Sequence, residues 1–217
     1  MMTEAKICGL STDETVLAAI NSGAKYIGFV FFPRSPRNVS IEQASKLAAT
    51  AGKNVLKVGV FVNPDDAFLT DVLKDVDLDI IQLHGNETND RINQVRERFS
   101  KTVMKAISVA SVNDINKARE YEKSADILLF DAKAPVDMDH ALPGGNGLAF
   151  DWNLIAGYQW QIPWMLSGGL DINNVREAIK ISGAGIVDIS SGLETAPGNK
   201  DINMIEAFMN EIQETAK

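Results

Sequence analysis

Short runs rich in isoleucine, valine and phenylalanine recur along this chain, and most of them are separated by longer segments with helical spacing. Such runs predict strands, and the segments between them predict helices with polar starts and apolar faces. The expected strands are Ala5–Gly9, Tyr26–Phe31, Leu56–Val62, Ile80–Leu83, Val103–Ile107, Ile127–Phe130, Trp164–Leu166 and Ile186–Ile189. The expected helices are Asp13–Ser22, Ile41–Ala51, Asp65–Lys74, Thr88–Phe99, Val112–Glu122, Asp151–Ala156, Asn173–Ile181 and Asp201–Glu214. Each expected helix follows an expected strand.

This alternation favours parallel strands, because parallel neighbours need a crossover connection and helices must cover the sheet. Eight such units in 217 residues fit an α/β fold, a compact (β/α)₈ TIM barrel that spans residues 1–217 as one domain. A doubly wound open sheet is the alternative, but it would favour roughly five or six strands and a glycine-rich turn after the first. The first turn here instead reads Cys8-Gly9-Leu10-Ser11-Thr12.

Composition excludes several other classes of protein. Hydrophobic residues at 45% and charged residues at 23% are typical of a globular protein rather than a disordered or membrane chain. The net charge of −8 disfavours binding to nucleic acid or to an anionic membrane. Residues 1–6 lack the apolar stretch of a signal peptide, and the single cysteine suits a reducing compartment. We therefore expect a cytoplasmic protein, either monomer or homodimer, with a small-molecule substrate.

In a barrel of this kind the active site lies where the strands end. Cys8 ends the first expected strand, where its thiolate could act as a nucleophile or base, or it could be an inert buried cysteine. Asp131 ends an apolar run, which would raise its pKa toward that of a general acid. It could instead cap a helix or pair with Lys133. Both residues are candidates for proton transfer.

The remaining titratable candidates are few. His84 follows the fourth expected strand and could titrate near neutral pH, or simply form hydrogen bonds at the barrel mouth. Since His84 and His140 are the only histidines, and there is one cysteine, we expect no metal site. Lys105 and Lys133 at strand ends could suit a Schiff-base aldolase, which would require a buried, deprotonated amine.

Two features favour an anionic ligand. The loop Pro33-Arg34-Ser35-Pro36-Arg37 carries two guanidinium groups, either of which could bind a carboxylate or remain solvated. Glycines Gly168 and Gly169 follow the seventh strand, and Ser190, Ser191 and Gly192 follow the eighth. Small residues let backbone N–H groups approach a phosphate, and in eight-stranded barrels these two loops often form a phosphate site. Tight turns would explain either motif alone.

Several ordered segments are recognisable together. They are Lys6-Ile7-Cys8-Gly9-Leu10, Gly28-Phe29-Val30-Phe31, Ser35-Pro36-Arg37, Val58-Gly59-Val60-Phe61-Val62-Asn63, Gln82-Leu83-His84-Gly85, Leu129-Phe130-Asp131, Phe150-Asp151-Trp152, Ser167-Gly168-Gly169-Leu170 and Val187-Asp188-Ile189-Ser190-Ser191-Gly192-Leu193-Glu194. In this order, over almost the whole chain, they resemble the phosphoribosylanthranilate isomerase family. The loop Gly144-Gly145-Asn146-Gly147-Leu148 departs from the Gly-Gly-Thr-Gly-Lys often found there.

The resemblance implies a (β/α)₈ enzyme of tryptophan biosynthesis. It would convert N-(5-phosphoribosyl)anthranilate to 1-(2-carboxyphenylamino)-1-deoxyribulose 5-phosphate by an Amadori rearrangement without a cofactor. Asp131 would be the general acid at the ring oxygen, and Cys8 the base at C2′. Arg37 would bind the anthranilate carboxylate, and Asp188 the anthranilate amine or ribose hydroxyls, with His84 nearby. The loops of Gly168, Gly169, Ser190, Ser191 and Gly192 would bind the phosphate.

Two other functions remain open. The related isomerase of histidine biosynthesis performs the same chemistry on a larger substrate with two phosphates, and it is expected to use an aspartate as its base. Cys8 and a single clear phosphate site favour the anthranilate substrate. A catalytically silent barrel that only binds a sugar phosphate is the alternative from another class, because fold alone does not specify function.

Overall fold

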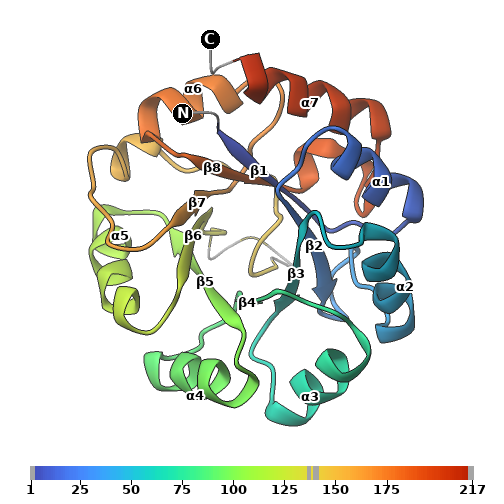
Figure 1. Ribbon diagram of the computed structural model, residues 1–217. Helices are drawn as coiled ribbons and strands as arrows, with labels where there is room; N and C mark the ends of the chain where they lie inside the picture. The colour runs from blue at the N-terminus through green and yellow to red at the C-terminus, as the bar shows by residue number, and fades with distance from the viewer. Residues whose placement is uncertain (1–2, 136–137, 139–141, 215–217) are drawn as a thin grey trace.

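In the computed structural model, which describes residues 3–135, 138 and 142–214, eight parallel strands close into a barrel in chain order (Figure 1). The barrel strands are β1 (Glu4–Cys8), β2 (Tyr26–Phe31), β3 (Leu56–Phe61), β4 (Ile80–Leu83), β5 (Thr102–Val109), β6 (Ile127–Ala132), β7 (Trp164–Leu166) and β8 (Ile186–Ile189). The helices around it are α1 (Asp13–Asn21), α2 (Ile41–Ala51), α3 (Asp66–Asp75), α4 (Asn89–Phe99), α5 (Val112–Ala118), α6 (Val175–Ser182) and α7 (Ile202–Glu214). The predicted (β/α)₈ barrel is therefore confirmed.

Shorter elements modify the connections. Three 3₁₀ segments occur, η1 (Arg119–Lys123), η2 (Trp152–Leu154) and η3 (Ser191–Leu193), together with a small antiparallel hairpin, β9 (Glu194–Ala196) and β10 (Asn199–Lys200). The hairpin follows β8 and precedes α7, so it lies beside the end of β8 at which polar residues gather. The sequence analysis did not predict this hairpin.

Two predicted helices were wrong in part. The segment Asp151–Ala156 forms only the three-residue η2, which Asp151 caps and which is followed by Gly157 in a left-handed conformation with φ 76°. The segment Val112–Glu122 leaves α-helical geometry at Ala118 and continues as η1. Short connections such as these satisfy their backbone groups by caps and 3₁₀ bonds instead of by regular helix.

Strands β5 and β6 run further than their apolar runs predicted. Ser108 pairs with Asp131 and Val109 with Ala132, so the ladder continues past Phe130. Side chains along a strand alternate between faces. Asp131 therefore shares the inward face with Leu129, which belongs to the apolar cluster inside the barrel.

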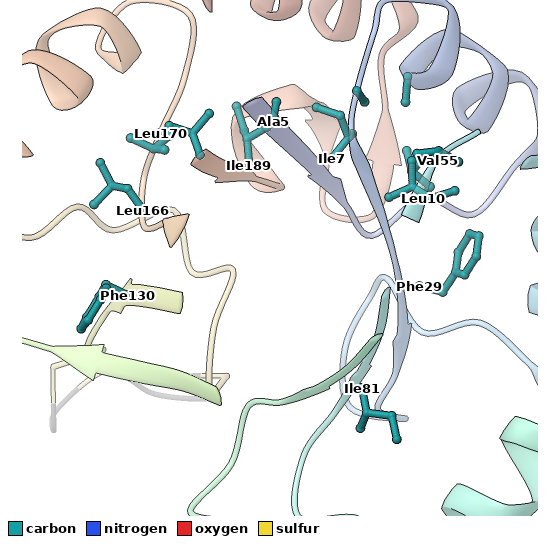
Figure 2. Close-up of a cluster of buried hydrophobic side chains, with 14 of the residues drawn as sticks. Ala5, Ile7, Leu10, Phe29, Val55, Ile81, Phe130, Leu166, Leu170 and Ile189 are labelled. Carbon is teal, nitrogen blue, oxygen red and sulfur yellow. The ribbon is translucent and has the colours of Figure 1, made fainter. Parts of the chain in front are cut away.

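Apolar packing occurs on both sides of the barrel wall. A large cluster fills the space between strands and helices, and Figure 2 shows members such as Ile7, Phe29, Ile81 and Phe130. A smaller cluster inside the barrel includes Val58, Ile80, Met104, Leu129 and Met165. Above the smaller cluster, inward positions near the strand ends carry Cys8, Asp131 and Asp188. The apolar layers thus close the barrel below and leave the polar layer at its mouth.

Helix starts are held close to the strand ends by side-chain caps. The side chains of Thr12, Ser40, Asp65 and Thr88 each accept a hydrogen bond from a backbone N–H three residues later. Such caps satisfy N–H groups that have no partner within the helix. Across the described ranges, no helix has the length and apolar character needed to cross a membrane.

Candidate active site

A cavity opens at the carboxyl ends of the strands, as expected for a barrel of this kind. The predicted site residues that line it are Cys8, Arg37, His84, Asp131, Gly168, Gly169, Asp188, Ser190 and Ser191. Cys8 belongs to β1 and Asp131 to β6, and two strands on one side and four on the other separate β1 from β6 in the closed barrel. The two proton-transfer candidates therefore face one cavity from different sides.

A buried charge cluster surrounds Cys8. The Lys6 Nζ atom lies 2.8 Å from Asp188 Oδ1, and Asp188 Oδ2 accepts a hydrogen bond of 3.1 Å from Ser167 Oγ. Burial raises the pKa of the Cys8 thiol, and the nearby Asp188 charge adds to that rise, whereas the Lys6 ammonium opposes it. Although burial disfavours the ammonium, Asp188 and Cys8 together raise the pKa of Lys6. The Cys8 thiol therefore lies beside Lys6, which stays positively charged at neutral pH.

Sequence reasoning missed Lys6 as a site residue. A signal was present, because Lys6 and Cys8 are two positions apart on one strand and must share a face. A lysine on the buried face of a barrel strand needs a partner, since an isolated buried charge is unfavourable. That partner, Asp188, lies 182 positions away in the sequence.

A second cluster surrounds Asp131. Its Oδ1 atom accepts a 2.9 Å hydrogen bond from the backbone N–H of Ala132, and its Oδ2 atom lies 3.3 Å from His84 Nε2. On the other side of the ring, His84 Nδ1 lies 3.0 Å from the Gln82 side-chain nitrogen. His84 thus lies between the Gln82 side chain and the Asp131 carboxyl group, with one ring nitrogen toward each. Lys133 instead lies 4.0 Å from Asp114, so the predicted alternative of an Asp131–Lys133 pair is wrong.

The phosphate-site candidates are held by close backbone packing. Gly168 has φ 91°, and a β-carbon there would lie 2.7 Å from the Ala132 backbone nitrogen. A β-carbon at Gly192 would lie 2.1 Å from the Leu170 carbonyl oxygen. Gly192 therefore does not line the described cavity but lets the loops after β7 and β8 approach each other. Within the cavity these loops present Gly169, Ser190 and Ser191.

Arg37 is buried, whereas Arg34 in the same loop is exposed and does not line the cavity. Arg37 Nε and Nη2 donate to the two carboxylate oxygens of Glu194, at 2.7 and 2.8 Å. Lys200 also pairs with Glu194 and lies 3.3 Å from Ser190 Oγ. The cluster of Arg37, Glu194 and Lys200 has two positive charges and one negative, so it provides the local positive charge that an anionic ligand requires. Sequence analysis did not identify Glu194 or Lys200 as site residues.

Because of the Arg37–Glu194–Lys200 cluster, the free energy of unfolding should fall as the solution becomes acidic. Burial alone would raise the pKa of Glu194, but hydrogen bonds and attraction from Arg37 and Lys200 lower it from 4.5 to about 2. A lowered carboxyl pKa stabilises the fold above the unfolded-state value, and this contribution is lost as the pH falls from about 4.5 toward 2. We expect Glu194→Gln to lower the free energy of unfolding by about 3 kcal/mol at pH 7.

Urea unfolding between pH 2 and pH 7 measures this effect, and the difference between wild type and Glu194→Gln should shrink as the solution becomes more acidic. Glu42→Gln is the matched control, because Glu42 pairs with Lys46 on an exposed helix face. Exposed pairs of this kind contribute little to the free energy of unfolding, so this variant should be nearly as stable as wild type at every pH. A Glu194 variant with a constant deficit across this pH range would contradict the assigned ion pairing.

Neither lysine considered for a Schiff base lines the described cavity. Lys105 Nζ is bound to Glu87 at 2.8 Å and to the Gly85 carbonyl oxygen at 2.7 Å. Burial lowers the pKa of Lys105 despite this pairing, but its side chain borders a separate groove beside Ser108. Lys133 is about half exposed and borders the same groove. The Schiff-base alternative therefore has no amine at the cavity.

The described residues offer no cluster of metal ligands either. In the ranges 3–135 and 142–214, no three histidine, cysteine, aspartate or glutamate side chains form a group that could hold a metal ion. His140 lies outside the described residues.

Comparisons with known proteins agree on one family. Residues 5–211 match the family model described as N-(5'phosphoribosyl)anthranilate (PRA) isomerase. A relative from Parvibaculum lavamentivorans, named N-(5'-phosphoribosyl)anthranilate isomerase, is 53% identical over 209 residues, which cover 96% of this chain and 97% of the relative.

Solved structures give the same result. The crystal structure of phosphoribosyl anthranilate isomerase from Thermotoga maritima has a TM-score of 0.87 and 36% identity, covering 98% of this chain and 100% of that one. Another crystal structure of a phosphoribosyl anthranilate isomerase, in complex with reduced 1-(o-carboxyphenylamino)-1-deoxyribulose 5-phosphate, has a TM-score of 0.84 at 35% identity, with coverage of 98% and 100%. The chain belongs to the N-(5'-phosphoribosyl)anthranilate isomerase family.

Proposed function

We propose that this chain converts N-(5-phosphoribosyl)anthranilate to 1-(2-carboxyphenylamino)-1-deoxyribulose 5-phosphate. The observation that carries the proposal is the placement of Cys8 and Asp131 in one cavity, on strands β1 and β6. An aldose-to-ketose rearrangement needs a proton donor at the ring oxygen and a proton acceptor at the neighbouring carbon. Family membership and the complex of a related enzyme with a reduced product support the same reaction.

Asp131 supplies the first proton in this account. The carboxylic acid protonates the furanose ring oxygen as the bond from that oxygen to C1′ breaks, and the anthranilate nitrogen forms a C=N bond to give an iminium ion. The Oδ1 atom is held by the Ala132 N–H, and Oδ2 faces His84. The Ala132 hydrogen bond therefore fixes one oxygen of the carboxyl group, and the other oxygen faces the cavity beside His84. A fixed carboxyl geometry favours proton transfer.

Cys8 takes the second proton. Its thiolate removes the proton from C2′, and the electron pair of that C–H bond forms a C1′=C2′ bond while the iminium nitrogen becomes neutral. The resulting enolamine gains a proton at C1′ and loses one from the C2′ hydroxyl, which leaves the ketone. Reactant and product have the same atoms, so the reaction needs no net oxidant or reductant.

The rest of the cavity would position the substrate. Gly168, Gly169, Ser190 and Ser191 would bind the phosphate through small residues whose backbone is accessible, while Gly192 keeps the two loops together. Arg37 would bind the anthranilate carboxylate. Asp188 would contact the anthranilate amine or ribose hydroxyls, and His84 lies beside the acid.

We expect Arg37→Ala to raise KM by about 10- to 100-fold and to change kcat much less. A charge-assisted hydrogen bond to the substrate carboxylate would contribute about 1.5–3 kcal/mol in both ground state and transition state. Steady-state kinetics measure both constants. Arg34→Ala is the matched control, because Arg34 is exposed in the same loop. An Arg37→Ala enzyme with unchanged KM would contradict the carboxylate role.

Product analysis tests the proposed function against its alternatives. The protein is incubated separately with N-(5-phosphoribosyl)anthranilate and with the two-phosphate substrate of the histidine-pathway isomerase. The products are separated by chromatography, and their masses are measured by mass spectrometry. We expect an isomer of unchanged mass only from the anthranilate substrate. Turnover of the two-phosphate substrate alone would replace the proposal with that isomerase. No product from either would leave a barrel that only binds phosphate.

A further inference from the structure

A buried lysine lies beside the proposed base, and the proposed reaction does not use it. We propose that Lys6 is a positioning residue whose ammonium group stabilises the thiolate of Cys8, and that Asp188 holds this ammonium in place. The inference rests on the proposed function in one respect, namely that Cys8 acts as the base. It adds a counter-ion for that base and a structural role for Asp188.

The geometry brings the two groups together. Lys6 and Cys8 lie two positions apart on β1 and therefore share its inward face. Cys8 pairs in register with Gly28 of β2, which has no side chain to separate them. A β-carbon on Gly28 would lie 2.8 Å from Cys8 Sγ and 3.3 Å from Lys6 Nζ. The sulfur and the ammonium nitrogen thus both lie next to the space that a Gly28 side chain would occupy.

Asp188 holds the ammonium from the other neighbouring strand. It pairs in register with Lys6 across β1 and β8, and the two side chains form a 2.8 Å ion pair in which Lys6 is fully buried. The second Asp188 oxygen accepts a hydrogen bond from Ser167 Oγ, so the carboxylate is itself fixed. The Lys6 ammonium is therefore held from the β8 side of its strand by a carboxylate that is itself hydrogen-bonded.

The charges around the thiol act in opposite directions. Lys6, Asp188 and Lys200 are the charged groups that influence Cys8, and the Arg37 stem packs near the adjacent Gly9. Burial and Asp188 raise the pKa of Cys8, whereas Lys6 and Lys200 lower it. Lys200 Nζ is already bound to Glu194. Lys6 lowers the pKa of Cys8 more than Lys200 does, and its ammonium nitrogen lies beside the same Gly28 position as the sulfur, so Lys6 is the cation that favours the thiolate most.

Alkylation of the thiol tests this inference without substrate. Cys8 is the only cysteine in the sequence, so the rate of its reaction with iodoacetamide reports the thiolate at this position alone. The rate is measured against pH for the intact protein and for two variants. Lys6→Met should lower the rate at pH 7 by about tenfold or more and shift the profile to higher pH, because a tenfold change corresponds to one pKa unit.

Asp188→Asn should have the opposite effect. It removes the negative charge that disfavours the thiolate, and the asparagine oxygen can still accept the hydrogen bond from Lys6 and keep the ammonium beside the sulfur. The rate at pH 7 should therefore rise, and the profile should move to lower pH. Opposite shifts in two variants at one ion pair are a signature that general structural damage would not produce. If Lys6→Met fails to fold, the Asp188→Asn profile alone decides the question.

Two controls complete the experiment. Lys57 is also buried and ion-paired, to Asp77 and Asp79, but at the other end of the barrel. Lys57→Met should reduce stability without moving the alkylation profile. Lys6→Arg keeps the positive charge, so its alkylation profile should lie much closer to that of the wild type than the Lys6→Met profile does.

An unchanged profile in a folded Lys6→Met variant, or shifts of Lys6→Met and Asp188→Asn in the same direction, would overturn the inference. An unchanged profile in Asp188→Asn alone would also overturn it when Lys6→Met does not fold. Failure of the proposed function would look different. In that case the profiles would shift as expected while the wild-type protein left N-(5-phosphoribosyl)anthranilate unconverted.

Discussion

Replacing Cys8 with alanine is expected to lower kcat by about 10²–10⁴-fold, the range typical of removing a general base. Alanine lacks any group that could take the C2′ proton, and Cys8 is the only cysteine of the sequence and lines the cavity. The fold should survive, because the change removes one sulfur atom from a site at the edge of the cavity. Steady-state turnover and thermal unfolding, measured on the same preparation, separate the two effects.

Cys8→Ser is the informative companion variant. It keeps the size and the hydrogen-bonding capacity of the side chain, but a hydroxyl is far less acidic than a thiol and gives almost no anion near neutral pH. We expect it to lose most of the activity that Cys8→Ala loses. Turnover within about threefold of wild type in Cys8→Ala would remove this residue from the mechanism, since a general base contributes at least about 10²-fold.

The second large effect is expected at Asp131. Asp131→Asn should lower kcat by about 10²–10⁴-fold, because an amide has the shape of the carboxyl group but cannot transfer a proton to the ring oxygen. Asparagine can still accept the hydrogen bond that Asp131 receives from the Ala132 N–H, so the end of β6 should remain in place. Turnover is measured by loss of substrate fluorescence, and folding by circular dichroism.

Asp114→Asn is the matched control for Asp131→Asn. Asp114 caps the start of α5 and lies 4.0 Å from Lys133, but it does not line the described cavity. Its replacement should change stability little, because the asparagine oxygen can still accept the backbone hydrogen bonds of Ala110 and Ser111, and it should leave kcat near the wild-type value. If the two variants lost turnover equally, the acid would not be Asp131.

The fold was largely predictable because short apolar runs and helices with polar starts are local signals. Strands β2, β4, β7 and β8 begin and end where their apolar runs predicted. The ends of β5 and β6 were not predictable, because their extension depends on pairing between Ser108 and Asp131. The missing helix around Trp152 has the same kind of cause, since a short polar-capped segment is compatible with both helix and 3₁₀ turn.

Some residues of the candidate site could be predicted from local sequence signals, and others could not. Cys8, Asp131 and the glycines could be found because each follows an apolar run, and the barrel rule places strand ends together. The ion pairs could not be found in this way. Lys6 and Asp188 are 182 positions apart, and Arg37 and Glu194 are 157 apart. Only closure of the barrel, which makes β1 a neighbour of β8, reveals that these charges are partners.

Fluorescence of freshly generated N-(5-phosphoribosyl)anthranilate, followed at neutral pH with a metal chelator present, tests the central claim most directly. Spontaneous hydrolysis to fluorescent anthranilate in buffer alone is the control. The account predicts a rapid loss of fluorescence after the wild-type protein is added, and a rate near the buffer control for Cys8→Ala and Asp131→Asn. A wild-type protein that left the fluorescence at the level of the control would contradict the account.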